Sequence, residues 1–169
     1  MKNILAAITL LIISTTAFAQ TKSISNAKVS FEIKNLGIKT GGTIGGVQGT
    51  IAFDPAALAT SKIEATADVN TINTDNDMRD EHLKKDDYFD VQKYPKIGLS
   101  SVSFKKANGN NFTGQFNLTL KGKTKLVEVP FTYADNSFKG SFKINRRDFA
   151  IGGNSMTMGD EVAINFEAK

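Results

Sequence analysis

Residues 79–95, RDEHLKKDDYFDVQKYP, hold the densest group of side chains that could do chemistry, including the only histidine of the chain, His82. A histidine among carboxylates is typical of general acid–base catalysis, and such a group can also hold a divalent ion. However, the chain has no cysteine and no G-x-S-x-G motif, and this stretch has neither His-x-x-His spacing nor the D-x-D-x-D-G order of a calcium loop. We therefore predict no catalytic residue and no metal ligand, and interpret His82 and Asp86 as a pair on a helix surface.

The same stretch has the signals of a short helix. Asp77 and Asp80 have the spacing of a capping box, and Pro95 is a stop signal, so we predict a helical excursion of about fifteen residues between two strands. Such an excursion can cover one mouth of a barrel. Arg79 has two alternative roles: it pairs with a nearby aspartate and braces the excursion, or it binds an anionic head group in bidentate fashion.

The elements around this stretch are predicted strands. Apolar and polar residues alternate with a period of two after Gln20, which predicts about eight strands. Short polar turns separate most of them, for example NGNN at 108–111 and DNS at 135–137, so sequential strands should be antiparallel. Closing the sheet removes its exposed edges. The pattern therefore favours an all-β, eight-stranded antiparallel barrel with one short helical excursion over a sandwich.

The interior of this barrel has two alternative forms. Ala65, Ala67, Gly114 and Gly140 are small residues on faces that are otherwise large and apolar, which favours a hollow interior that holds one ligand. Small residues also occur in tightly packed barrels, where they relieve a bend or fit a taper. For the hollow form, the predicted apolar wall consists of Phe31, Ile33, Ile51, Ile63, Ala65, Ala67, Leu99, Phe116, Leu118, Phe131, Phe142 and Phe166.

The N-terminal residues 1–19 have the layout of a secretory signal peptide cleaved after Ala19, with Lys2, an apolar run and small residues before Gln20. Residues 20–169 are then expected to form a single domain that is periplasmic or secreted and is stable without disulfides. The formal net charge of the whole chain is +4, and its basic residues are scattered. Nucleic acid is therefore excluded as a partner, whereas a transient contact with an anionic membrane surface stays open.

An ordered set of motifs resembles one family. RDEHLKKDDYFDVQKYPKIGL, LTLKGKTKLVEVPF and INRRDFAIGG are similar to motifs of the YceI-like, lipid- and polyisoprenoid-binding family, and the resemblance covers nearly all of residues 24–168. It implies a lipocalin-like antiparallel barrel with a pocket for a long isoprenoid or similar amphipathic lipid. The chain departs from the family at Ile44 and Val47, where the family often has phenylalanine, and at Ala150, which replaces a frequent glycine. These departures affect which ligand fits.

The prediction is therefore a binding protein that carries, stores or sequesters a polyprenyl phosphate or quinone type of lipid, without a cofactor. Two alternatives stay open: a ligand-free structural or stress-response barrel, and an enzyme that acts on a small apolar substrate. Arg79, His82 and Arg146 are candidates to contact the head group, although Arg146 has the alternative of a salt bridge to Asp148 or another loop acid. A homodimer is compatible with a barrel of this kind.

Overall fold

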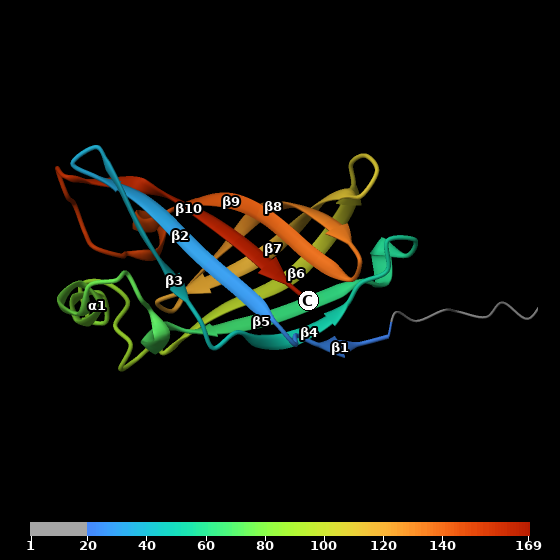
Figure 1. Ribbon diagram of the computed structural model, residues 1–169, viewed down its shortest axis with the longest axis horizontal. Coiled ribbons are helices and arrows are strands. Elements are labelled where there is room, and N and C mark those ends of the chain that lie inside the picture. The colour runs from blue at the N-terminus through green and yellow to red at the C-terminus, as the bar shows by residue number, and fades with distance from the viewer. Residues whose placement is uncertain (1–19) are drawn as a thin grey trace, which may run out of the picture.

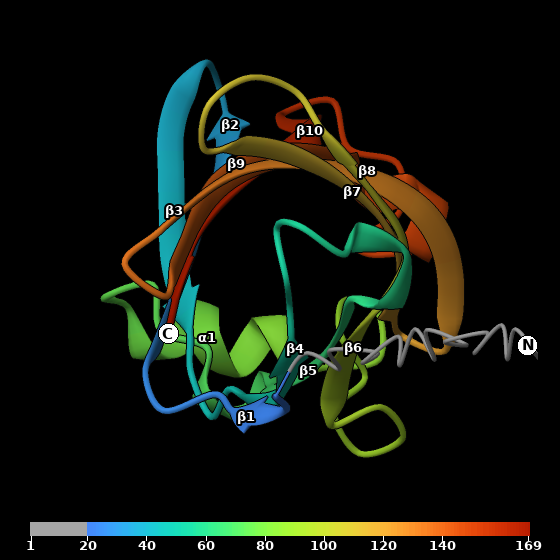
Figure 2. The same cartoon turned by 90° about the vertical axis from the view of Figure 1, so that its right-hand side faces the viewer.

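The protein is described by a computed structural model over residues 20–169, and the predicted signal peptide lies outside the described residues. Ten strands form one antiparallel sheet in the order β1-β4-β5-β6-β7-β8-β9-β10-β2-β3. The sheet curls until its strands surround a central space (Figures 1 and 2). The all-β barrel with one short helix is thus confirmed. The strands are β1 (Lys22–Ser23), β2 (Ala27–Asn35), β3 (Ile38–Ile44), β4 (Gln48–Ala52), β5 (Lys62–Asp68), β6 (Lys96–Lys106), β7 (Asn111–Leu120), β8 (Lys123–Ala134), β9 (Ser137–Asn145) and β10 (Met158–Ala168).

The eight predicted strands are present, and two further ones, β1 and β3, were missed. β1 has only two residues, and β3 contains Gly41 and Gly42, a residue type that is depleted in strands. Glycine is needed at position 42 because a Cβ there would collide with the Asn73 carbonyl and lie 2.8 Å from Thr74 Cγ2. The low strand propensity of this segment therefore serves a close approach between two backbones.

The two edge strands of the sheet, β1 and β3, do not pair with each other in the described part of the chain. β3 instead meets the segment after β5 through one isolated bridge, in which Thr43 N donates to Asn73 O at 2.8 Å and Asn73 N to Thr43 O at 3.0 Å. Two bonds beside it involve Gly45, which donates to Thr71 Oγ1 at 2.7 Å and accepts from Asp68 N at 3.0 Å. We call this contact between residues 43–45 and 68–73 the seam.

Aromatic rings fill one end of the barrel. The Phe53 ring packs edge-on against five others, with centroid separations between 4.9 and 5.7 Å; these are Phe104, Phe112, Phe131, Tyr133 and Phe138. Such pairs stabilise a fold beyond the area that they bury.

Two of the small inward residues are explained by close packing rather than by a hollow interior. A Cβ at Gly114 would collide with the Phe116 ring, and a Cβ at Gly140 would collide with the Pro130 carbonyl and lie 2.8 Å from Phe166 Cζ. The aromatic rings therefore occupy the space that these two glycines leave.

The opposite end is covered by residues 76–95, which we call the lid segment. Its helix α1 (Asp77–Leu83) is shorter than the predicted excursion, and turns form the remainder. The helix cap is Asn76 rather than Asp77, because Asn76 Oδ1 accepts a hydrogen bond from Arg79 N at 3.0 Å. Lys121, in the β7–β8 turn, fastens the segment by donating to Asp86 O at 2.6 Å and to Ala150 O at 3.0 Å. The lid thus lies at the β7–β8 end (Figure 1).

Candidate functional site

A cavity of about 260 Å³ lies inside the barrel, and its accessible lining is apolar. All twelve predicted wall residues line it. Many of them, for example Phe31, Ala65, Leu99 and Phe166, are only partly buried even though they point inward. Apolar side chains in a filled core are nearly inaccessible, so this partial exposure reflects an open interior.

The cavity also uses residues that the wall prediction omitted. The lid segment contributes Leu83, Tyr88 and Phe89, and the two departures from the family pattern, Ile44 and Val47, are in the lining too. β2 and β10 contribute five further apolar residues, two of which are alanines: Ala27, Val29, Val162, Ile164 and Ala168. The strand residues could have been found from the same alternation that gave the others, whereas the lid contribution depends on how the chain folds back after α1.

The residues that line the cavity are spread along the length of the strands. On β9 and the turn that follows, the lining includes Phe138, Phe142, Ile144 and Arg146. These positions span eight residue steps, or roughly 26 Å at about 3.3 Å per residue. A space of this shape suits a long, narrow molecule better than a compact one.

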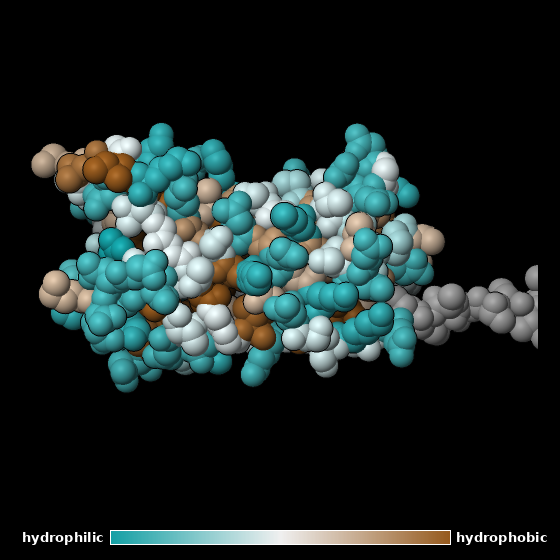
Figure 3. Space-filling model, viewed as in Figure 1, coloured by the Kyte–Doolittle hydropathy of each residue, from teal (hydrophilic) through white to brown (hydrophobic). Residues whose placement is uncertain are grey.

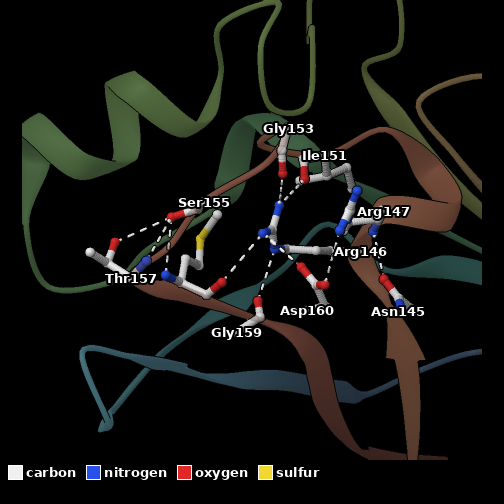
Figure 4. A network of polar contacts seen from close by, with 10 residues as sticks. Asn145, Arg146, Arg147, Ile151, Gly153, Ser155, Thr157, Gly159 and Asp160 are labelled. Carbon is white, nitrogen blue, oxygen red and sulfur yellow. Dashed lines mark hydrogen bonds and ion pairs between the residues drawn. The ribbon is translucent and has the colours of Figure 1, made fainter.

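Arg146 is the only buried charged residue of the lining, with 2% of its surface exposed. Its guanidinium donates to four backbone carbonyls and one carboxylate (Figure 4). Nε bonds to Gly159 O at 2.9 Å, Nη1 to Ile151 O at 2.7 Å and Gly153 O at 2.8 Å, and Nη2 to Met158 O at 3.4 Å and Asp160 Oδ1 at 2.9 Å.

These five bonds use all five N–H donors of the arginine. The salt bridge expected as the alternative role of Arg146 exists, but its partner is Asp160 rather than Asp148. The reason is topological: η3 (Arg146–Phe149) turns Asp148 away, while β10 brings Asp160 back beside β9. Arg146 therefore ties the loop between η3 and β10 to the barrel wall.

The other two head-group candidates, Arg79 and His82, lie on the lid segment and are not in the cavity lining. Arg79 donates from Nε to Thr74 Oγ1 at 2.8 Å and from Nη2 to Thr74 O at 2.5 Å, so it braces the lid through a threonine rather than an aspartate. His82 Nε2 lies 3.3 Å from Asp87 Oδ2, and its ring packs edge-on against Tyr88. The predicted pairing with Asp86 is wrong because α1 ends at Leu83, before a further helical turn could form.

Asp80 anchors the lid from a buried position, with 8% of its surface exposed. Its carboxylate accepts hydrogen bonds from both Thr74 N and Thr74 Oγ1. We expect Asp80→Ala to lower the free energy of unfolding by about 1–3 kcal/mol, because a buried amide loses its acceptor. Urea unfolding measures this, with Glu81→Ala as the control at the next, exposed position. Equal losses in both variants would contradict the anchoring role.

Asp68 is the residue at the seam whose titration is shifted. The pKa of Asp68 is lowered from its ordinary value, first because Asn70 Nδ2 donates to its carboxylate and then because Lys96 Nζ does so. It also caps η2 (Val69–Thr71) by accepting from Asn70 N. The ionised form of Asp68 therefore persists to lower pH than that of a free aspartate.

Residues 20–169 contain no group of three or more histidines, cysteines or carboxylates placed to hold a metal ion. The same residues include no helix that is both long and apolar enough to span a membrane.

The model of the YceI-like domain matches residues 21–169. Among curated proteins, a UPF0312 protein of Pectobacterium atrosepticum is 33% identical over 105 residues, which cover 62% of this chain and little more than half, 54%, of that protein. The protein YceI of Salmonella arizonae is 31% identical over 137 residues, or 75% of this chain and 71% of that protein.

Solved structures share the fold. BcnA of Burkholderia cenocepacia superposes with a TM-score of 0.80 at 31% identity, over 84% of this chain and 94% of BcnA. A polyisoprenoid binding domain from Saccharophagus degradans, described as implicated in plant cell wall breakdown, superposes with a TM-score of 0.64 at 14% identity, over 90% of this chain and 97% of that domain. At this low identity, the second likeness concerns the fold alone.

Proposed function

Because this chain belongs to the YceI-like domain family, we propose that its barrel binds one long isoprenoid lipid, of the polyprenyl phosphate or isoprenoid quinone type. The lipid tail lies in the cavity between the aromatic end and the lid segment. The protein carries or stores this lipid in the periplasm or outside the cell, in keeping with the signal peptide predicted at residues 1–19. The twelve wall residues contact the tail.

The observation that carries the proposal is the shape and chemistry of the cavity. Its accessible surface is apolar, and its lining runs along β9 from Phe138 to Ile144 and on to Arg146 in η3. Within the described residues, no buried side-chain polar atom lacks a hydrogen-bond partner. The one buried charged residue of the cavity lining, Arg146, uses all five of its N–H donors in hydrogen bonds to the chain itself. The interior therefore offers contacts for a hydrocarbon tail and no polar pair for catalysis, which favours a binding protein over an enzyme.

Two further points support a lipid. The polyisoprenoid binding domain from Saccharophagus degradans has the same fold, and our proposal extends its kind of ligand to this chain. A ligand-free structural barrel would need a filled interior, and a cavity of about 260 Å³ argues against it.

The energetics need no catalytic or ionic contribution. Burial of apolar groups contributes about 0.8 kcal/mol per methylene-sized group, so a few isoprene units supply on the order of 10 kcal/mol. Association and ordering costs remove several kcal/mol of this. A dissociation constant of about 1 μM, which corresponds to about 8 kcal/mol, is then within reach.

The proposal is tested with the ligand that the protein acquires and with a series of lipids. Native mass spectrometry of protein purified from its natural host should show a bound apolar mass. With farnesyl, geranylgeranyl and longer prenyl phosphates, affinity should rise at least about tenfold with each added isoprene unit until the cavity is full, because each unit buries five carbons. Protein that carries no apolar mass and binds no member of the series would refute the proposal.

A further inference from the structure

The lid end of the barrel has a cluster of exposed apolar side chains that packing within the chain does not explain. Leu36, in the turn between β2 and β3, and Ile38, the first residue of β3, are 73% and 69% exposed, and Met156, in the loop before β10, is fully exposed. Leu36 N donates to Thr157 O at 2.7 Å, so the turn and the loop are joined. We call Leu36, Ile38 and Met156 the apolar corner. Apolar residues gather at this corner of the molecule, above the lid segment, in Figure 3.

The conformation of Leu36 is a second, independent observation. Asn35 and Ile38 form the last pair of the β2–β3 ladder, so Leu36 and Gly37 make a two-residue turn. Both have a positive φ, 51° and 78°, as in a type I′ turn. The first of these positions favours asparagine, aspartate or glycine, and leucine there is strained. Neither the backbone conformation nor packing within the chain therefore explains a leucine at position 36. Residues that break a local rule in this way are expected at functional sites.

Basic residues outnumber acidic ones around the apolar corner, with Lys34, Lys39 and Arg147 against Glu32 and Asp160. The two segments that form it, KNLGIK at residues 34–39 and GGNSMT at 152–157, contain two lysines and no acidic residue. Lys39 pairs with Glu32 at 2.9 Å, and Lys34 has no ion pair among the described residues. Arg147 lies beside Met156, in a shallow surface hollow that both residues line, and its side chain, which is half exposed, pairs with Asp160 at 3.4 Å. Apolar tips flanked by cations complement a bilayer whose head groups are anionic.

We propose that the apolar corner docks the barrel on an anionic membrane surface, with Leu36, Ile38 and Met156 inserted among the lipids. The corner lies at the same end as the lid segment, so docking brings the lid end of the cavity to the bilayer from which a lipid would be taken (Figure 1). α1 also exposes an apolar residue, Met78, which is 84% exposed, but Asp77 and Glu81 lie beside it on the helix surface, and anionic head groups repel these two carboxylates. The molecule therefore approaches through the corner and not through the helix.

Vesicle flotation with the purified protein tests the docking. Wild type should float with vesicles of phosphatidylethanolamine and phosphatidylglycerol, less so at high salt and less with phosphatidylcholine alone. Leu36→Asn combined with Met156→Ser should lower the vesicle-bound fraction about tenfold or more, because two inserted apolar groups are lost. Leu36→Asn places the favoured Asn-Gly pair in the turn, so thermal stability should be unchanged or higher.

The control is Val102→Ser, which removes an apolar side chain that is 55% exposed on β6, away from the corner, and should float like wild type. Wild type that does not float, or a double variant that floats equally well, would overturn the proposal. So would a wild-type dimer that the double substitution converts to a monomer in sedimentation velocity without any vesicle binding, because the corner would then join two copies. The double variant also separates docking from lipid binding. It should still bind a farnesyl phosphate probe in solution even though it no longer floats with vesicles.

Discussion

Phenylalanine at position 65 or 67 should abolish lipid binding while the barrel still folds. Ala65 and Ala67 lie on β5 with their side chains in the cavity lining, two residues apart on one face. A phenyl ring at either position occupies space that the lipid tail would fill. We expect the affinity for a prenyl phosphate to fall by about a hundredfold or more, or about 2.7 kcal/mol, as the cavity is shortened or split. Isothermal titration with geranylgeranyl phosphate measures the change.

The matched control is Ala163→Phe on β10. Ala163 lies between Val162 and Ile164, pairs with Glu32 and Lys143 on its neighbouring strands, and is not in the lining. The same substitution there adds a ring to the outer face of the sheet and should leave affinity unchanged. If Ala65→Phe and Ala67→Phe both bind with wild-type affinity and retain a cooperative unfolding transition, the tail does not lie along β5 and the proposed site is wrong.

Loss of the Arg146 guanidinium is expected to give the largest drop in stability of any single substitution proposed here. Arg146→Met keeps the apolar stem but leaves four backbone carbonyls without this donor and Asp160 with Arg147 as its remaining partner. Each buried carbonyl that loses its donor costs about 1–3 kcal/mol, so the loss of several donors should lower the free energy of unfolding by about 3–5 kcal/mol. Arg146→Lys should recover only part of this, because an ammonium has three donors and cannot span the same acceptors.

Urea denaturation measures these losses, and Arg147→Met is the control. Arg147 is a neighbouring arginine that also pairs with Asp160, at 3.4 Å, but its side chain is half exposed. An exposed ion pair contributes about 0–1 kcal/mol, so that variant should unfold close to wild type. If Arg146→Met were as stable as Arg147→Met, the buried network would not hold the loop before β10.

Alternation of apolar and polar residues was sufficient to predict eight of the ten strands, because one-sided burial imposes a period of two on each of them. It failed at β3, where Gly42 reflects a close contact with residues 73–74, far along the chain, and Gly41 a close approach to the β2 backbone at Phe31. The same limit applies to the glycines at 114 and 140. Only the positions of the neighbouring rings show that these two glycines accommodate packing, whereas Ala65 and Ala67 border open space.

Polar partners were the least predictable part of the candidate site. The residue types suggested Asp86 for His82 and Asp148 for Arg146, each close in sequence, and the structure uses Asp87 and Asp160. Sequence spacing predicts side-chain pairs only inside a regular helix or strand. His82 lies in the last turn of α1 and Arg146 follows directly after β9, so the path of the turn beyond each element determines which carboxylate is within reach.

The barrel wall should open more easily at the seam than between any two paired long strands. β10 and β2 are joined along eight paired positions, whereas residues 43–45 meet residues 68–73 through one bridge and two flanking bonds. Local opening follows the line where the fewest hydrogen bonds must break, so amide hydrogens of Thr43 and Asn73 should exchange with solvent earlier than those of β7 and β8. A barrel wall that opens transiently at the seam can widen the cavity for a bulky branched chain. The strand pairs elsewhere in the sheet keep their register while it does so.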